Sequence, residues 1–274
     1  MFDGGKRITG GCGDVVLKKI KAKRRYAWVH NEFEELGFNR SICLSMFDNF
    51  NGIVNVSAIC KRTFDSFVPE YSSKSFVVNN TVDEIQLQKA RINRKIFKDN
   101  KKIHVVTVCR IKNQQKRLDR AINACQRLLQ KEINDFCWYI IGDGPDLKWV
   151  KQEIEERKIS DNLICLGKKE IPFDYMKTAD LFVLCSQYEA FPMTLIEAIT
   201  LGIPVLVTAF NSATEIVENG NNGIICENST SGLTNALEQL LSNPDAIYKF
   251  RQNTDNSESF NAKALKQFME VINS

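Results

Sequence analysis

The stretch EAFPMTLIEAITLGIPVLV, residues 189–207, decides the fold of this chain. Pro192 stands where the first turn of a helix tolerates a missing N–H group, and Gly202 supplies a helix stop. The apolar, β-branched run 203–208 that follows predicts a buried strand. The stretch therefore predicts a helix over 192–201 that feeds a strand of an α/β sheet.

Two carboxylates of this stretch stand eight positions apart, with Glu189 on the loop before the helix and Glu197 inside the helix. A helix N-terminus presents free backbone N–H groups and a positive dipole, which suit a phosphate group. Carboxylates beside it can accept hydrogen bonds from sugar hydroxyls. The bare Glu-x7-Glu spacing is common in charged helices, so the whole stretch carries the prediction.

From residue 102 onward, strand-like and helix-like segments alternate along the chain. Strands that are apolar on both faces and joined by helices indicate a parallel sheet covered on both sides. We therefore expect residues from about 101 to 255 to form a six-stranded, Rossmann-like domain. The predicted strands are 103–109, 136–141, 163–166, 181–185, 203–208 and 223–226, and the predicted helices are 118–129, 147–157, 173–177, 192–201, 213–218 and 232–241.

The residues before this domain are organised differently. The sequence predicts a basic helix over 14–23, strands over 26–30, 52–57 and 75–78, a helix over 60–67 and a turn over 79–83. The predicted organisation is a partial N-terminal domain (1–90), a linker (91–101), the Rossmann-like domain (102–255) and a C-terminal helix (256–274) that can pack back on the N-terminal part.

The stretch 189–207, with Phe-Pro before its helix and Gly-Ile-Pro-Val after it, resembles the matching segment of family 4 retaining glycosyltransferases of the GT-B fold. The segments YAWVHN (26–31), GIVNVS (52–57) and VNNTVD (78–83) resemble the second half of the N-terminal domain of these enzymes. The resemblance implies one complete Rossmann-like C-terminal domain plus a partial N-terminal Rossmann-like domain. It implies that the first half of the N-terminal domain is lacking, which leaves the acceptor side incomplete.

Two cations lie near the expected carboxyl end of the first strand of the Rossmann-like domain, where open α/β sheets bind ligands. Arg110 follows strand 103–109, and Lys116 precedes the next helix. Two cations on one loop can clamp a diphosphate through charge-assisted bonds of about 1.5–3 kcal/mol each. In the family, the matching Arg and Lys neutralise the leaving diphosphate, although Cys109 and Arg117 stand where the family commonly has glycine. The alternative is a pair of ordinary surface cations.

The resemblance also implies roles for residues of the deciding stretch. Glu189 approaches the donor sugar, Glu197 holds the ribose hydroxyls, and backbone N–H groups of Phe191, Met193 and Thr194 line the phosphate and sugar. The alternatives are a plain exposed helix residue for Glu197 and core-filling side chains for Phe191 and Met193.

Two glycine-containing loops lie at the same predicted edge. The segment IIGDGP (140–145) lacks the third glycine of a dinucleotide fingerprint, so NAD or FAD binding is disfavoured. In the family this turn shapes the nucleotide side of the cleft, and a structural role is expected for Gly142 and Gly144. Gly167 and Lys168 occupy the comparable loop after strand 163–166, nearer the base.

The chain has two histidines. His104 lies inside an apolar strand and is expected to be a packed core residue. His30 ends strand 26–30 and matches a family loop histidine that contacts the donor sugar or the leaving phosphate; the alternative is a turn-capping role. The sequence has no Asp-x-Asp and no ligand-spaced His/Cys/Asp set, so a metal-dependent mechanism is disfavoured.

Composition is ordinary for a globular protein, with 43% hydrophobic and 26% charged residues. Apolar runs have strand length and stay below the roughly 18 residues of a membrane span. The nine cysteines are scattered singly, which favours reduced thiols in the cytosol. Residues 1–25 carry eight Lys/Arg against two Asp, a basic segment that can contact anionic lipid headgroups at the inner membrane face. A solvated helix face is the alternative, and nucleic acid is disfavoured because aromatic residues are not interleaved.

The resemblance predicts a retaining hexosyltransferase that catalyses with Glu189, Arg110, Lys116 and His30. The expected donor is a nucleotide-diphosphate sugar, of which a UDP-sugar is the commonest in the family, and the expected acceptor is a carbohydrate or lipid-linked saccharide in surface polysaccharide synthesis. No cofactor and no metal are expected. A non-catalytic nucleotide-sugar-binding module is the alternative, because the acceptor side is incomplete.

Overall fold

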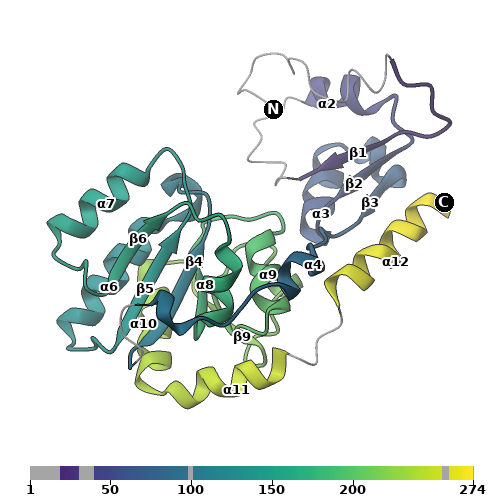
Figure 1. Cartoon of the computed structure of the whole chain (residues 1–274). Helices are drawn as coiled ribbons and strands as arrows, with labels where there is room; N and C mark the ends of the chain where they lie inside the picture. The colour runs from purple at the N-terminus through teal and green to yellow at the C-terminus, as the bar shows by residue number, and fades with distance from the viewer. Residues whose placement is uncertain (1–18, 31–39, 98–100, 255–258, 274) are drawn as a thin grey trace. The chain divides into compact units, whose positions relative to one another are not determined.

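The computed structural model describes residues 19–30, 40–97, 101–254 and 259–273, and the chain divides into two compact units (Figure 1). The N-terminal unit comprises Met1–Thr81, Glu189–Phe191 and Glu258–Ser274, and the C-terminal unit comprises Val82–Tyr188 and Pro192–Ser257. The described residues of the expected linker 91–101 lie in the C-terminal unit and include the 3-10 helix η3 (Arg94–Ile96). The domain boundaries at residues 90, 101 and 255 stay predictions.

The C-terminal unit is built on a six-stranded parallel sheet, as predicted, and its strand order is β6-β5-β4-β7-β8-β9. Because each crossover in a parallel sheet needs a connection of a dozen or more residues, helices separate the strands in the chain. The strands are β4 (Ile103–Val108), β5 (Phe136–Ile141), β6 (Leu163–Gly167), β7 (Leu181–Leu184), β8 (Val205–Thr208) and β9 (Gly223–Cys226). The helices are α4 (Glu84–Gln88), α5 (Asn113–Lys116), α6 (Leu118–Gln130), α7 (Leu147–Glu156), α8 (Pro172–Thr178), α9 (Met193–Thr200), η4 (Ala213–Glu215), α10 (Thr230–Ser242) and α11 (Pro244–Thr254).

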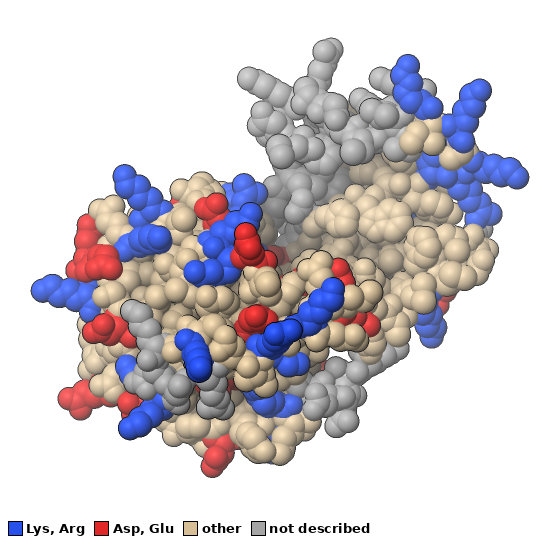
Figure 2. Space-filling view, in the orientation of Figure 1, with Lys and Arg blue, Asp and Glu red and all other residues tan. Residues whose placement is uncertain are grey.

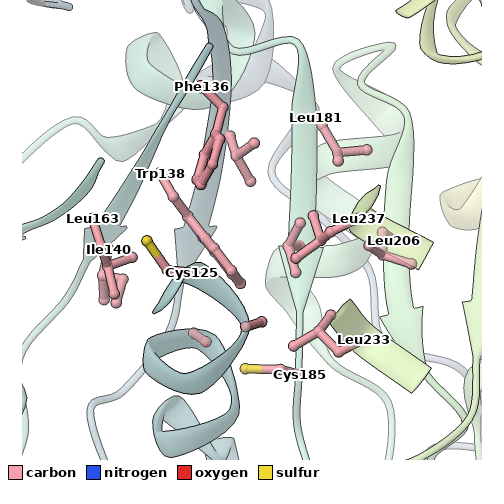
Figure 3. Close-up of a cluster of buried hydrophobic side chains, with 14 of the residues drawn as sticks. Cys125, Phe136, Trp138, Ile140, Leu163, Leu181, Cys185, Leu206, Leu233 and Leu237 are labelled. Atoms are coloured by element: carbon pink, nitrogen blue, oxygen red, sulfur yellow. The ribbon is translucent and has the colours of Figure 1, made fainter. Parts of the chain in front are cut away.

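One face of this sheet forms the main hydrophobic core with α6, α7, α10 and α11. Figure 3 shows part of this core, with residues of the sheet, α6 and α10 labelled. Alternate residues of β5, Phe136, Trp138 and Ile140, point into it, as the twofold period of a strand requires. Trp138 is fully buried, and its indole Nε1–H donates to Thr107 Oγ1 at 2.9 Å, so the polar end of this large side chain is satisfied. The core therefore fixes the sheet whose carboxyl edge carries the candidate site.

The start of β8 differs from the prediction, which placed it at residue 203. Helix α9 ends in a Schellman motif: Gly202 adopts φ 75°, its N–H donates to Ile199 O at 2.9 Å, and the Ile203 N–H donates to Ala198 O at 3.0 Å. Pro204 has no N–H to donate. Because Ile203 closes the helix, strand pairing begins only at Val205.

The N-terminal unit contains a three-stranded parallel sheet in the order β1-β2-β3. One face packs against α2 and α3, where Phe47 and Phe64 meet edge to face with ring centroids 5.5 Å apart. On the other face, Val54 and Val78 pack against Val271 of the C-terminal helix α12. The elements of this unit are β1 (Tyr26–Val29), α2 (Arg40–Phe47), β2 (Gly52–Asn55), α3 (Ala58–Phe67), η2 (Pro69–Lys74), β3 (Ser75–Val77) and α12 (Phe260–Asn273).

The other differences from the prediction concern strand β2, which ends at Asn55 and not at residue 57, and several helical segments. Half of the expected basic helix over 14–23, residues 14–18, lies outside the described residues, and residues 20–23 are not helical. Helices α2, α4, α5 and α11 were not predicted. No helix in the described part of the chain is long and apolar enough to cross a bilayer.

Candidate functional site

The connection that follows β4 carries both predicted cations. Arg110 lies two residues beyond the end of β4 and is exposed, and Lys116 is the last residue of the short helix α5 and is half-buried. Arg117 then adopts the left-handed conformation, with φ 48°, between α5 and α6. The structure therefore brings Arg110 and Lys116 to one loop at the carboxyl edge of the sheet, where open α/β folds bind ligands.

The turn after β5 supports the backbone on both sides of Arg110. A Cβ on Gly142 would lie 1.9 Å from the carbonyl oxygen of Cys109, and a Cβ on Gly144 would lie 2.2 Å from that of Ile111. The Ile111 N–H donates to Asp143 O at 2.8 Å, which joins the two loops directly. The two glycines thus permit a close backbone approach that a side chain would prevent.

The loop after β6 continues this edge. Gly167 has φ 70° and accepts a hydrogen bond from the Gly142 N–H at 3.0 Å. Lys168 is exposed immediately after it. The loops after β4, β5 and β6 therefore form a bonded series, with Arg110 in the first and Lys168 in the last.

The loop between β7 and α9 carries Glu189 and Phe191, which belong to the N-terminal unit. Both are buried, with 5% of each residue exposed. Within that unit, the Asn80 side chain donates to Phe191 O at 3.2 Å. The buried Phe191 ring fits the core-filling alternative for this side chain, and its backbone role stays a prediction.

The N-terminus of α9 begins at Met193 and Thr194, both half-buried. Its N-cap residue is Pro192, and no side chain caps the helix by a hydrogen bond. The first N–H groups of a helix have no partner within the helix, so this end can receive an anion.

Glu197 lies in the second turn of α9 and is half-buried, whereas its neighbours Leu195, Ile196 and Ala198 are fully buried. Burial raises the pKa of the Glu197 carboxyl, because leaving water disfavours the charged form. A partly desolvated carboxylate is a strong acceptor for ligand hydroxyl groups. Glu197 is therefore not the plain exposed residue of the alternative reading.

The two histidines differ in their surroundings. His30 is exposed just after β1 in the N-terminal unit. His104 is buried and stacks on Phe97 with ring centroids 4.3 Å apart, so it is a packed residue as predicted. Among the described residues, no group of three His, Cys, Asp or Glu side chains could hold a metal ion.

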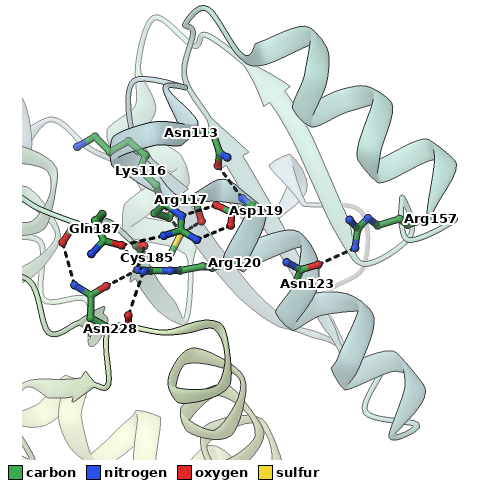
Figure 4. Close-up of polar contacts among 10 residues, drawn as sticks. All are labelled: Asn113, Lys116, Arg117, Asp119, Arg120, Asn123, Arg157, Cys185, Gln187 and Asn228. Atoms are coloured by element: carbon green, nitrogen blue, oxygen red, sulfur yellow. Dashed lines mark hydrogen bonds and ion pairs between the residues drawn. The ribbon is translucent and has the colours of Figure 1, made fainter.

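Not predicted from the sequence is a polar network behind the β4 loop (Figure 4). Arg117 forms a bidentate pair with Asp119, at 2.9 and 2.8 Å, and Arg120 bonds to Gln187 and Asn228. Arg120 is buried on the apolar side of α6. A charged residue at four-residue spacing from the apolar Ala124 is the sequence feature that could have pointed to it.

Comparison with known proteins agrees with this architecture. Residues 88–257 match the family model described as "Glycosyl transferases group 1", which covers more than half of the chain. N-acetyl-alpha-D-glucosaminyl L-malate synthase of Bacillus anthracis is 31% identical over 103 residues, 37% of this chain and 27% of the relative. UDP-Gal:alpha-D-GlcNAc-diphosphoundecaprenol alpha-1,3-galactosyltransferase of Escherichia coli is 33% identical over 113 residues, 39% of this chain and 28% of the relative. The matches thus span little more than a quarter of the length of these two curated relatives.

Among solved structures, Anabaena HepE in complex with UDP and glucose superposes with a TM-score of 0.76 at 16% identity, covering 92% of this chain and 72% of that one. Its likeness shows the fold. The predicted α/β architecture of GT-B type, with Rossmann-like parallel sheets, is confirmed. By the family model that matches residues 88–257, the chain belongs to the glycosyl transferases group 1 family.

Proposed function

We propose that this glycosyltransferase is a family 4 enzyme that transfers a hexose from a nucleotide-diphosphate sugar to a carbohydrate or lipid-linked acceptor, with retention of configuration, in surface polysaccharide synthesis. The observation that carries the proposal is the carboxyl edge of the large sheet. There, Arg110 and Lys116 share one loop, and α9 begins without a side-chain cap. Cations and free helix N–H groups at one edge suit a diphosphate.

In this proposal, the main electrostatic effect is stabilisation of the negative charge on the leaving diphosphate. Arg110 and Lys116 neutralise its charge, which grows as the bond to the sugar breaks. Backbone N–H groups of Phe191, Met193 and Thr194 bind its oxygens. Gly142 and Gly144 shape the loop that carries Arg110.

The remaining roles concern the sugar, the ribose and the base. Glu197 accepts hydrogen bonds from the ribose hydroxyls, and its partly desolvated carboxylate supports this role. Glu189 and His30 contact the donor sugar, and Gly167 and Lys168 lie nearer the base. We propose a UDP-sugar as donor and a reaction without a metal or cofactor; HepE, of the same fold, binds UDP and glucose.

Calorimetry with UDP and with uridine tests the diphosphate assignment. Replacing Arg110 or Lys116 with Ala should weaken UDP binding about tenfold to a hundredfold, the equivalent of one charge-assisted bond, and leave uridine binding nearly unchanged. Lys148→Ala, an exposed lysine on α7, is the control and should change neither. Equal losses for UDP and uridine would contradict the assignment.

Transfer itself is tested by turnover of UDP-, GDP- and ADP-hexoses with and without carbohydrate acceptors. A labelled hexose that appears on an acceptor, with its anomeric configuration kept, is the expected result. The second candidate function is nucleotide-sugar binding without transfer. It is favoured by the location of Arg110, Lys116 and Glu197 in the C-terminal unit, whereas the described N-terminal sheet has three strands. Binding without turnover by the chain would favour this candidate.

We further propose peripheral contact of the basic segment 1–25 with anionic lipid on the cytoplasmic side of a membrane. In the described part of this segment, Lys19, Lys21, Lys23 and Arg24 are exposed. Figure 2 shows Lys and Arg side chains gathered at one end of the N-terminal unit, whereas both signs of charge mix over the C-terminal unit. Co-sedimentation with anionic but not neutral vesicles tests this contact.

A further inference from the structure

Arg120 is a buried cation whose hydrogen bonds all go to neutral oxygens. Only 3% of the residue is exposed. NH1 donates to Cys185 O at 3.1 Å and to Asn228 Oδ1, and NH2 donates to Gln187 Oε1 at 2.6 Å and to Asn228 O at 3.1 Å. The buried Nε–H has no hydrogen-bond partner in the described part of the chain.

This arrangement is costly for stability alone. A buried charge is stabilised best by an opposite charge, and an unpaired buried donor adds a further penalty. Burial lowers the pKa of Arg120, and the nearby Arg117 guanidinium lowers it further. An apolar residue would pack on this side of α6 at lower cost, so the position of the guanidinium calls for another explanation.

The acceptors of Arg120 come from loops that are far apart in the sequence (Figure 4). Cys185 and Gln187 follow β7, and Asn228 follows β9. Asn228 Nδ2 in turn donates to Gln187 O at 3.0 Å and to Ala209 O, after β8, at 3.3 Å. The Arg120 guanidinium therefore joins α6 to the loops after β7 and β9, and Asn228 extends the network to the residue after β8.

The same loops hold the backbone around Lys116. Gln187 N–H donates to Gln115 O at 2.7 Å, one residue before Lys116. The Cys185 thiol lies 3.2 Å from Lys116 O and 3.3 Å from Arg117 O. Arg117 NH1 also donates to Gln187 Oε1, at 2.9 Å, so this amide oxygen accepts hydrogen bonds from both Arg117 and Arg120. The segment on which Lys116 stands is thus fixed to residues that Arg120 holds.

We propose that Arg120 is a positioning residue, which fixes the Lys116 segment against the loops after β7 and β9 so that Lys116 meets the diphosphate. The inference rests on the proposed function. A guanidinium presents its donors in a rigid planar fork, which an ammonium group lacks. A lysine at position 120 therefore keeps the charge and loses the geometry. Displacing a functional group by about 1 Å can lower activity by up to about a hundredfold. A network that holds Lys116 in place can therefore matter for function.

The test compares Arg120→Lys and Arg120→Met with Arg157→Met in the full chain. Arg157 is a matched control: it also makes four side-chain hydrogen bonds, to Glu153, Asn123 and Gln126, at 2.8–3.0 Å, and it lies away from the network. Binding of UDP and uridine is measured by calorimetry, and amide hydrogen exchange is followed at residues 115–117, 186–188 and 136–141. Gln187→Ala, at an exposed position, covers the case in which the Arg120 variants do not fold.

Both Arg120 variants should weaken UDP binding about tenfold or more, leave uridine binding within about twofold, and speed exchange at 115–117 and 186–188 but not at 136–141. Gln187→Ala should show the same pattern to a smaller degree, and Arg157→Met should change none of these quantities. Equal losses for UDP and uridine, unchanged exchange at 115–117, or an Arg120→Lys chain that binds UDP normally would overturn the inference. If the unaltered chain binds neither UDP nor the other diphosphates, the proposed function fails, and the exchange measurement alone decides whether Arg120 positions this segment.

Discussion

At the scale of single residues, Glu197 is a carboxylate that we propose for ligand binding and that lowers the stability of the free protein. Its carboxylate lies on α9 beside fully buried apolar neighbours, and desolvation raises its pKa. A raised pKa in the folded state means that the folded chain binds the proton more tightly than the unfolded chain. By linkage, the ionised carboxylate then lowers the free energy of unfolding once the pH exceeds the ordinary pKa of glutamate.

Replacing Glu197 with Gln should therefore stabilise the free protein at pH 7. The gain in unfolding free energy should shrink as the pH falls, and vanish below about pH 4, where the carboxyl is protonated in both states. Urea titrations at several pH values measure this. Glu155→Gln, on the exposed face of α7, is the control for the loss of a carboxylate at an exposed position. A Glu197→Gln protein less stable than the parent at pH 7 would contradict the reading.

At the scale of elements, the strands were easier to predict than the contacts between loops. The bounds of β5 and β9 match the predicted 136–141 and 223–226, because apolar runs covered on both faces stand out in the sequence. Among the described side chains of helix α11, only Ile247 and Phe250 are buried, too few for a clear helical stripe. Arg110 and Lys116 could be placed because they follow a strand. Arg120 could not, since its partners lie 65 to 108 residues away.

The close approach of the β4 and β5 loops is a property of elements that one methyl group can test. In Gly144→Ala, the three atoms nearest the added Cβ would be backbone atoms of Ile111, at 2.2–2.8 Å, so the Arg110 loop must move. We expect a loss of about 1–3 kcal/mol in unfolding free energy, typical of overpacking, together with weaker UDP binding. Gly220→Ala is the control: it has φ 82° and nothing near its added Cβ, so it should cost about 1–2 kcal/mol of backbone strain and leave Ile111 undisturbed. Similar UDP binding by the two variants would refute the role of this contact.

At the scale of the whole molecule, the C-terminal helix α12 packs on the sheet formed by the N-terminal part of the chain. Helix α12 belongs to the N-terminal unit, whereas α11, which precedes it, belongs to the C-terminal unit. Gln267 Oε1 accepts the Asn79 N–H at 2.9 Å, and the Tyr26 hydroxyl donates to Val271 O at 3.3 Å. With Val54 and Val78 packed on Val271, these contacts cover one face of the three-stranded sheet. A sheet of so few strands needs such cover, because it buries little apolar surface by itself.

The same substitution at two adjacent residues of α12, one buried and one exposed, distinguishes the effect of burial from the effect of the added charge. Val271 is 2% exposed and Ile272 is 38% exposed. Val271→Asp would place an unpaired charge against Val54 and Val78, a change that costs several kcal/mol, whereas Ile272→Asp should stay within about 0.5 kcal/mol. Because α12 packs on the sheet β1–β3, hydrogen exchange should accelerate at residues 26–29 and 52–55 in Val271→Asp and remain slow at 136–141 in the C-terminal sheet. Retained protection of 52–55 in Val271→Asp would show that the N-terminal sheet does not depend on α12, and an equal effect of Ile272→Asp would show that the charge, not the burial, acts.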